Sequence, residues 1–439
     1  MNHTISNVLE FVKDNDIKFI RLAFCDIFGN QKNISIMPSE LERAFDCGIS
    51  FDASSINGFM NIEESDLFLV PDPATLSILP WRPSHGRVAR FFCDIKKPDG
   101  TNFEGDGRNI LKNVLKETQK MGYVCKVGTE CEFYLFETNQ NGFPTTIPFD
   151  YGEYFDVAPL DKGENIRREI CLTLEEMGII PESSHHESGP GQNEVDFKYS
   201  DALSAADNLV TFKYVVKTVA ASNGLFASFM PKPILNKAGN GLHINLSLCK
   251  NNENIFKNSI KEHSSDAESF IAGVLDKIAD ITVFLNPITN SYARFGSFEA
   301  PKYITWSHQN RSQLIRIPAA TGKYSRMELR SPDATCNPYI SFALIIKAGL
   351  DGIKLNTPLP PSLDKNLFNV DEEIIKDIDS LPISLKSAIE LAKKSDFIKT
   401  VIAKNTLDKY LSIKENLWNE YINTTDKQAF EKKKYFYTI

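Results

Sequence analysis

Polar and apolar residues alternate along several short stretches of the chain, a pattern typical of strands with one buried face. Glu130 and Glu132 share one face of TECEFYLF, His243 lies on one face of GLHINLSL, Glu194 on one face of NEVDF, and Glu328 on one face of RMELR. Apolar residues occupy the opposite face of each stretch. These strands favour a curved, mostly antiparallel sheet with helices behind it and a charged concave surface in front.

The first hundred residues predict a small unit of mixed structure. A helix near residues 6–13 precedes two alternating strands at 17–27 and 33–38, which a turn at Gly29 would join as a hairpin. The turn-rich segment at 98–107 is the best candidate for a domain boundary.

Helical and strand patterns are interspersed beyond that boundary. Helices are expected at 108–121, 165–177 and 207–222, with strands at 123–136 and 226–231. The last 80 residues are mostly helical and charged.

Composition narrows the classes of function. The chain has 439 residues, a net charge of −8 and 42% hydrophobic residues, as in an ordinary globular protein without the basic surface of a nucleic-acid binder. The longest apolar run, 340–350, is too short to cross a bilayer and contains Lys347. Eight cysteines without a CxxC pair indicate buried thiols, and no secretion signal is evident, so we expect a cytoplasmic protein without a membrane partner.

Taken singly, each acidic or histidine position has an ordinary interpretation. The Glu130–Glu132 pair is typical of a solvated strand face, His243 of a satisfied polar histidine, and HHE of an exposed loop. Glu328 lies between two arginines, as in a surface ladder of ion pairs. Joint occurrence changes this, because two carboxylates about 4 Å apart repel by roughly 4 kcal/mol at an effective dielectric of 20. Oxygen ligands with one imidazole suit Mg²⁺ or Mn²⁺, so we predict a cation site built from Glu130, Glu132, Glu187, Glu194, His243 and Glu328.

A group of arginines carries the complementary signal. They lie between positions 294 and 330 among small and apolar neighbours, and they are Arg294, Arg311, Arg316, Arg326 and Arg330. Arginine binds carboxylate and phosphate groups with two donors at once. Metal-binding carboxylates opposite such a cluster indicate phosphoryl transfer involving an anionic substrate. The chain has no P-loop or GxGxxG turn, so the sheet face, metals and arginines would hold a nucleotide.

These motifs resemble those of bacterial type I glutamine synthetase over essentially the full length of the chain. The matching stretches include DASSINGF, ARFFCDIKKPDGT, HHESGPGQNEVDFKY, FMPKP, NRSQLIRIPAA and NPYISFALIIKAGLDGIK. The resemblance implies that glutamate, ATP and ammonia give glutamine, ADP and phosphate through a γ-glutamyl phosphate. The implied fold class is α+β, with a small β-grasp-like domain at 1–103 and a catalytic domain at 104–439.

The same resemblance divides the cation ligands into two groups of three. One ion would be held by Glu132, Glu187 and Glu194, and the other by Glu130, His243 and Glu328.

It also implies roles for further residues. Arg294, with the backbone of Gly239, would bind glutamate. Residues near the phosphates and the intermediate would be Arg311, Arg316, Arg326 and Arg330, while ATP would contact Phe229, Ser247 and Lys323.

The ammonia step would use residues from two subunits. Glu299 matches a flap residue that takes a proton from the tetrahedral adduct, and Asp26 matches the base that deprotonates ammonium. Tyr154 and Glu187 would complete the ammonium site. Asp26 would come from a neighbouring subunit, which implies a homo-oligomer, a dodecamer of two stacked hexameric rings.

Two departures from the family pattern leave alternatives open. The flap RFGSFE, ending at Glu299, is one residue shorter than usual and carries Phe298 in place of tyrosine, and Ala238 replaces an asparagine that contacts glutamate. These changes motivate a second hypothesis, a γ-glutamylamide ligase that uses an organic amine. A third is a non-catalytic structural or regulatory homologue, against which the intact set of six ligands argues.

Overall fold

The N-terminal part of the chain forms a twisted sheet flanked by two helices. The computed structural model describes residues 4–62, 65–83, 85–256 and 263–439. Within that range the sheet follows the order β2-β1-β6-β4-β3, with β5 added to β6, and β1 runs parallel to β6. The elements are α1 (Ile5–Asp14), β1 (Ile17–Cys25), β2 (Gln31–Ile36), α2 (Leu41–Cys47), β3 (Ile49–Asp52), β4 (Asp66–Pro71), β5 (Ser77–Ile78) and β6 (Arg87–Lys96).

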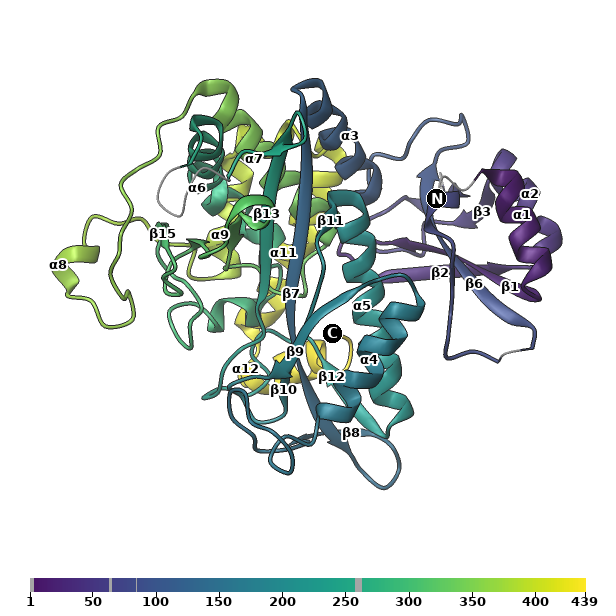
Figure 1. Cartoon of the computed structure of the whole chain (residues 1–439), viewed down its shortest axis with the longest axis horizontal. Coiled ribbons are helices and arrows are strands. Elements are labelled where there is room, and N and C mark those ends of the chain that lie inside the picture. The colour runs from purple at the N-terminus through teal and green to yellow at the C-terminus, as the bar shows by residue number, and fades with distance from the viewer. Residues whose placement is uncertain (1–3, 63–64, 84, 257–262) are drawn as a thin grey trace.

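A larger sheet forms the centre of the remaining chain (Figure 1). Its order is β15-β16-β17-β13-β7-β10-β9, and every pairing is antiparallel except that of β15 with β16. The strands are β7 (Tyr123–Thr138), β8 (Pro144–Pro148), β9 (Pro181–His186), β10 (Gln192–Phe197), β11 (Ser200–Asp201), β12 (Leu225–Ser228), β13 (Leu242–Lys250), β14 (Glu253–Asn254), β15 (Trp306–His308), β16 (Ile315–Ile317) and β17 (Met327–Leu329).

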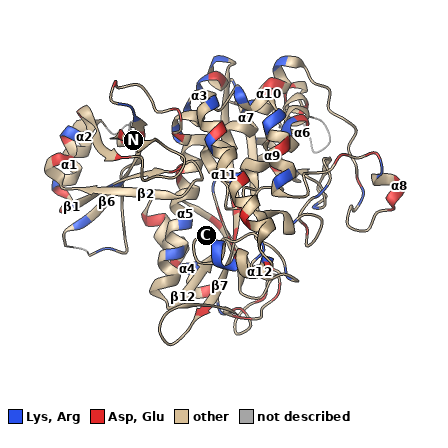
Figure 2. Ribbon diagram, turned by 180° about the vertical axis from the view of Figure 1, so that it is seen from behind, with Lys and Arg blue, Asp and Glu red and all other residues tan. Residues whose placement is uncertain are grey.

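Helices cover the apolar face of this sheet. α3 and α5 both pack against β7, and α7 packs against α3, α5 and α6. Figure 2 shows acidic and basic residues interspersed along the outer helices. The helices are α3 (Gly107–Lys120), α4 (Glu164–Glu176), α5 (Ala202–Ser222), α6 (Ser265–Leu285), α7 (Pro338–Leu355), α8 (Glu372–Ile375), α9 (Leu385–Lys394), α10 (Asp396–Lys399), α11 (Lys404–Asn423) and α12 (Lys427–Glu431).

The predicted alternation is present along the central strands. On β13, Leu242, Ile244 and Leu246 are buried in the core, and on β7 both Cys131 and Phe133 are fully buried. The polar residues between them therefore face the opposite side of the sheet. This confirms the predicted curved and mostly antiparallel sheet with helices behind it.

Most predicted elements are present, with shifted ends. The hairpin at Gly29 is confirmed, because β1 and β2 pair antiparallel from Cys25 and Gln31 outward. The helix expected at 207–222 begins earlier, at Ala202. The strand expected at 226–231 ends at Ser228, because the following FMPKP contains two prolines that cannot donate to a sheet ladder. Within the described residues, no helix is both long and apolar enough to cross a membrane.

A buried arginine connects the two sheets. Arg108, at the start of α3, donates to Asp207 on α5 with Nε and Nη2, to Asp94 on β6 with Nη1, and to Asp72 with Nη2, over distances of 2.9–3.1 Å. Its side chain is 4% exposed. Lys112 also pairs with Asp72 and Asp94, at 3.5 and 2.7 Å, whereas the one ion pair of Asp207 within the described residues is with Arg108.

We expect Arg108→Met to destabilise the protein by about 3–5 kcal/mol, because it leaves the buried Asp207 carboxylate without its ion pair. Urea unfolding followed by circular dichroism would measure this. Lys393→Met is the matched control, since its ion pair with Glu415 is about half-exposed on both sides and is worth at most about 1 kcal/mol. Equal losses in the two variants would contradict the role of Arg108.

Candidate active site

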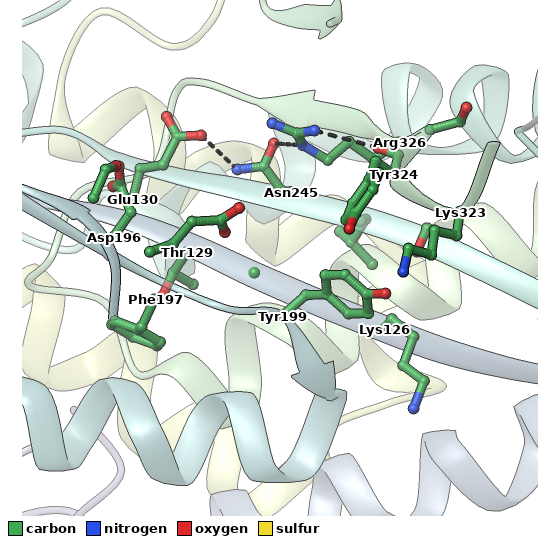
Figure 3. Close-up of a pocket in the computed structure, with 16 residues that line it drawn as sticks. Lys126, Thr129, Glu130, Asp196, Phe197, Tyr199, Asn245, Lys323, Tyr324 and Arg326 are labelled. Carbon is green, nitrogen blue, oxygen red and sulfur yellow. Dashed lines mark hydrogen bonds between the residues drawn. The ribbon is translucent and has the colours of Figure 1, made fainter. Parts of the chain in front are cut away.

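Two cavities meet on the polar face of the large sheet. The acidic cavity, of about 630 Å³, and a smaller groove, of about 250 Å³, share Glu130 and Asp196 in their walls. Figure 3 shows the groove, with these two carboxylates at one end and Lys126 and Lys323 at the other.

Strand register explains why acidic side chains converge in the acidic cavity. On β7, Glu130 lies opposite Asp196 of β10 and opposite His243 of β13, while Glu132 lies opposite Glu194. Directly opposite residues place their Cβ atoms about 4.5–5.5 Å apart. Like charges are thus imposed on neighbouring positions by the hydrogen-bonded ladder.

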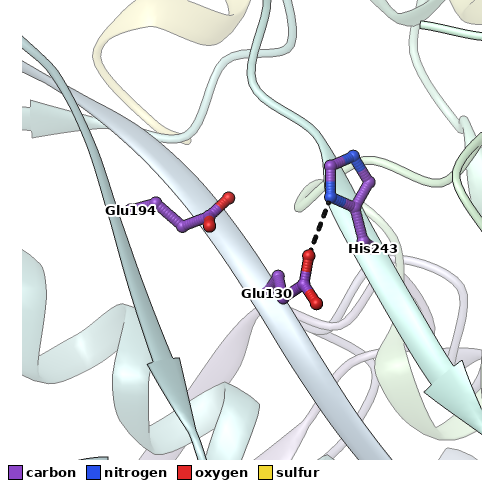
Figure 4. A group of neighbouring side chains, drawn as sticks. All are labelled: Glu130, Glu194 and His243. Atoms are coloured by element: carbon purple, nitrogen blue, oxygen red, sulfur yellow. Dashed lines mark hydrogen bonds and ion pairs between the residues drawn. The ribbon is translucent and has the colours of Figure 1, made fainter. Parts of the chain in front are cut away.

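Three of these side chains point toward one another from three strands (Figure 4). His243 Nδ1 lies 3.3 Å from Glu130 Oε2, and Glu194 completes a group whose ligand atoms lie within 4.8 Å of one another. A second such group comprises His185, Glu187 and Glu194, with His185 Nε2 2.8 Å from Glu187 Oε1. Glu194 belongs to both groups and therefore lies at the centre of the acidic cavity.

Two other predicted ligands are held by protein donors. Glu132 accepts hydrogen bonds from the amide of Gly241 at 2.9 Å and from Gln192 Nε2 at 3.0 Å. Glu328 is fully buried and pairs with Arg316 and Arg330, each at 2.5 Å. Both remain near His243, at 3.9 Å from its ring nitrogens. All six predicted side chains are thus brought together, although the grouping around Glu194 differs from the two predicted triplets, which stay a prediction.

The acidic cavity distorts the proton affinities of its own carboxylates. Burial, followed by the charge of Asp196, raises the pKa of Glu194 well above its ordinary value. Burial and the charge of Glu130 raise the pKa of Asp196 to about 7. Burial opposes the charged form of Glu130 as well, but its hydrogen bond and ion pair with His243 lower its pKa. Without a cation, the cluster therefore keeps protons that neutralise part of its negative charge. Its oxygen and imidazole donors suit a hard divalent cation, which would neutralise the cluster in their place.

Three arginines at this site carry unused donors: Arg294 and Arg330 line the acidic cavity, and Arg316 reaches it through Glu328. The Nε atoms of Arg294, Arg316 and Arg330 are buried without a hydrogen-bond partner in the described residues. Arg294 Nη1 donates to the carbonyls of Ser331 and Pro332, at 3.0 and 3.2 Å. Unsatisfied buried donors of this kind are costly and suit an anionic ligand.

The backbone of Gly239 passes very close to Arg294. A Cβ atom at Gly239 would lie 2.5 Å from the carbonyl oxygen of Pro231 and 2.7 Å from Arg294 Cγ. A residue without a side chain is therefore required where the chain forms the wall beside this guanidinium. Ala238 precedes it, and its carbonyl accepts a hydrogen bond from Tyr134 at 2.6 Å.

The predicted flap lies over the arginine end of the acidic cavity. Arg330 Nη2 is 3.4 Å from the carbonyl oxygen and 3.9 Å from the carboxylate of Glu299. Phe298 and Glu299 both have positive φ, at 48° and 64°, which costs energy in residues with a Cβ. The buried Lys232 ammonium lies 4.4 Å from the Phe298 ring centre and helps to hold this conformation. Arg311 and Tyr154 line the same cavity, and the Tyr154 ring meets His185 edge-on.

Residues predicted to contact ATP separate into two groups. Ser247, Lys323 and Arg326 line the groove, where Arg326 Nε donates to Asn245 Oδ1 at 2.8 Å. The Phe229 side chain is fully buried in the core against Phe133 and lines neither cavity, so its contact with ATP stays a prediction. Arg316 also lines neither cavity and reaches the site through Glu328.

Sequence reasoning missed two aromatic residues of the groove. Tyr199 and Tyr324 are 45% and 53% exposed and flank the opening (Figure 3). Tyr199 follows a register shift between Asp196 and Phe197, which interrupts the alternation that marked the other site residues. The signal available in the sequence was a tyrosine that directly follows a strand pattern.

Asp26 lies away from both cavities of its own chain, on the turn after β1. Its carboxylate accepts hydrogen bonds from the Phe28 amide and from the amide and side chain of Asn30, at 2.9–3.0 Å. Burial outweighs these bonds and raises its pKa.

Comparison with known proteins identifies both parts of the chain. Residues 16–98 match the family described as glutamine synthetase, beta-Grasp domain, and residues 104–433 match glutamine synthetase, catalytic domain. The glutamine synthetase of Clostridium saccharobutylicum is 48% identical over 424 residues, covering 95% of this chain and 96% of the relative. That of Methanosarcina mazei is 48% identical over 423 residues, covering 95% of each chain. A solved GmaS/ADP complex superposes with a TM-score of 0.88 at 29% identity, covering 98% of this chain and 99% of the other.

Mg²⁺ should raise the melting temperature of the protein more at pH 8 than at pH 6. In the absence of a cation, the folded chain holds protons on Glu194 and Asp196 that the unfolded chain releases near pH 4, so stability falls as pH rises through about 7. A cation at 100 times its Kd adds about 2.7 kcal/mol, and at pH 8 it displaces fewer protons.

Differential scanning fluorimetry at both pH values would measure the shift. Glu194→Gln is expected to lose most of it, whereas Glu176→Gln, on the exposed side of α4, should behave as wild type. Equal shifts in Glu194→Gln and wild type would argue against a cation site centred on Glu194.

Proposed function

The chain belongs to the glutamine synthetase family, and we propose that its acidic cavity, groove and flap carry out the family's reaction with the division of roles set out below. The protein catalyses ATP-dependent synthesis of glutamine from glutamate and ammonia. The relatives support this reaction over the organic-amine and non-catalytic alternatives.

The observation that carries the assignment of roles is the shared wall of the two cavities. Glu130 and Asp196 border both, so a nucleotide in the groove would direct its terminal phosphate into the acidic cavity. Tyr199 and Tyr324 would contact the base, and Lys323 and Ser247 would contact the remainder of the nucleotide.

Family membership implies divalent cations, which would be Mg²⁺ or Mn²⁺, held two to a site by Glu130, Glu132, Glu187, Glu194, His243 and Glu328. When bound, they would neutralise the charge of the transferred phosphoryl group.

The first half-reaction joins phosphate to glutamate. Arg294, with unused donor capacity beside the close backbone of Gly239, would bind the α-carboxylate of glutamate. The γ-carboxylate attacks the γ-phosphorus of ATP, and the bond to the β-phosphate oxygen breaks to release ADP. Arg311 and Arg330 would bind the resulting acyl phosphate, while Arg330 also holds Glu328 in place.

The second half-reaction replaces phosphate by ammonia. Asp26 would remove a proton from ammonium held by Tyr154 and Glu187, and ammonia would attack the acyl carbon. Glu299 would take a proton from the adduct as phosphate leaves. Closure of the flap over this site would exclude water from the acyl phosphate.

Assembly supplies the residue that a single chain lacks at its own site. Since Asp26 lines neither cavity of its chain, we propose that it serves the acidic cavity of a neighbouring subunit in a dodecamer of two hexameric rings. All eight cysteines are free thiols, which supports a reducing compartment and hence a cytoplasmic location.

The direct test is glutamine formation from glutamate, ammonium and ATP with Mg²⁺ or Mn²⁺, measured by mass spectrometry with and without a chelator. Turnover that persists after chelation would exclude the cation roles.

Two variants separate the half-reactions. Asp26→Ala should retain a first-turnover burst of ADP in rapid-quench experiments but make glutamine about 100-fold more slowly, because a general base is lost. Glu132→Ala should lose both the burst and the product. Comparable loss of the burst in Asp26→Ala would show that Asp26 has another role.

Mixing the same variants tests the shared site. Subunits of Asp26→Ala and Glu132→Ala that are co-expressed should regain part of the activity, because some sites then combine an intact Asp26 with an intact acidic cavity. Activity no higher than that of the separate variants would place Asp26 in its own chain's site.

Tyr199→Ala is expected to raise KM for ATP by roughly 5- to 150-fold, since stacking of a base on an aromatic ring is worth about 1–3 kcal/mol. Tyr199→Phe retains the ring and should stay within about threefold of wild type. KM for glutamate serves as the internal control and should change little in either variant. An unchanged KM for ATP in Tyr199→Ala would show that the base of ATP does not bind in this groove.

A further inference from the structure

A third cavity in the molecule has the opposite electrostatic character to the acidic cavity. It has a volume of about 530 Å³ and lies between the turn joining β1 to β2, helix α5 and helix α11. Four lysines line this lysine cavity, and none of its described lining residues is Asp or Glu. This positively charged lining contrasts with the net charge of the whole chain, which is −8. The lysines are Lys32, Lys213, Lys217 and Lys414.

These ammonium groups have few counter-charges. Lys213 and Lys217 donate to the main-chain carbonyls of Ala334 and Thr438, at 2.7 and 3.4 Å. Lys414 lies over two aromatic rings, 4.6 Å from the centre of Phe28. Within the described residues, the four lysines make a single ion pair, between Lys32 and Asp26 at 3.9 Å.

Burial disfavours the charged form of two of these lysines, Lys414 and Lys217. Lys414 is 5% exposed, and burial lowers its pKa to about 7 against the weaker attraction of Asp26 and Asp333. Burial, followed by the charge of Lys213, lowers the pKa of Lys217 to about 8. Among the described residues, Lys32, Tyr214, Tyr410 and the terminal carboxylate of Ile439 are the other charged or titratable groups around them. An anion in the cavity would offset this repulsion and restore the charged state of both lysines.

We propose that the lysine cavity binds a small multivalent oxyanion, a phosphate ester or a polycarboxylate. Its volume lies within the range of small-molecule sites, and its polar groups, Asn30 and Thr335 among them, can orient such a ligand. The site is separate from the acidic cavity and groove, with which it shares no lining residue. Its one described link to the reaction is the ion pair of Lys32 with Asp26, the proposed base.

Binding should be coupled to proton uptake. Each lysine that becomes charged with the ligand weakens the affinity by up to tenfold per pH unit above its pKa in the free protein. We expect the affinity to fall steeply from pH 7 to pH 9, and the heat of binding at pH 8 to depend on the ionisation enthalpy of the buffer.

Isothermal titration of the assembled, cation-free protein with pyrophosphate and with citrate tests the proposal and distinguishes the two ligand classes. Lys217→Met/Lys414→Met keeps the apolar stems and should bind at least 10-fold more weakly than wild type. Lys393→Met, which removes an exposed lysine, and Arg326→Gln, which alters the nucleotide groove, should both retain the pH-dependent binding.

The proposal is overturned if neither anion binds wild type, if binding is lost in Arg326→Gln but not in the double variant, or if the affinity is independent of pH. Should the double variant fail to fold, Lys217→Met alone, together with the buffer dependence of wild type, gives the same decision.

Discussion

Repulsion between carboxylates on adjacent strands is the constraint around which the catalytic part of this protein is organised. The hydrogen-bonded ladder fixes Glu130 opposite Asp196, and Glu132 opposite Glu194, and the fully buried side chains on the other face prevent the strands from slipping. A shift of one residue would turn Cys131 and Phe133 into the cavity and the acids into the core. The favourable free energy of core packing thus outweighs the repulsion between these like charges. Cations bound in the acidic cavity would reduce that repulsion and stabilise the folded state further.

Much of this arrangement could be predicted from the sequence, because the alternation of polar and apolar residues fixes which face a side chain takes. It gave the polar faces of β7, β10, β13 and β17 and hence five of the six acidic and histidine positions, whereas Glu187 lies in the loop after β9. Alternation carries no information on which strands are neighbours. It also cannot show that Glu132 and Glu328 find donors in Gly241, Gln192 and two arginines.

The errors have local causes. FMPKP resembles the continuation of the strand before it, but its prolines end the ladder at Ser228, so the strand expected at 226–231 is too long. Tyr199 was missed because the register shift before it moves the side chain to the cavity side. Both cases concern residues just beyond a strand end, where the two-residue period no longer determines direction.

The long central strand also bears on how the protein folds. β7 pairs with β13 more than a hundred residues later, and β13 pairs in turn with β17, near residue 328. Closing such long loops is entropically slow, so contacts of this kind form late during folding. The acidic cavity cannot exist before that closure, and a cation has no assembled site in the early chain. Cations would therefore act mainly by slowing the unfolding of the finished protein, and its lifetime in the cell would depend on the supply of divalent ions.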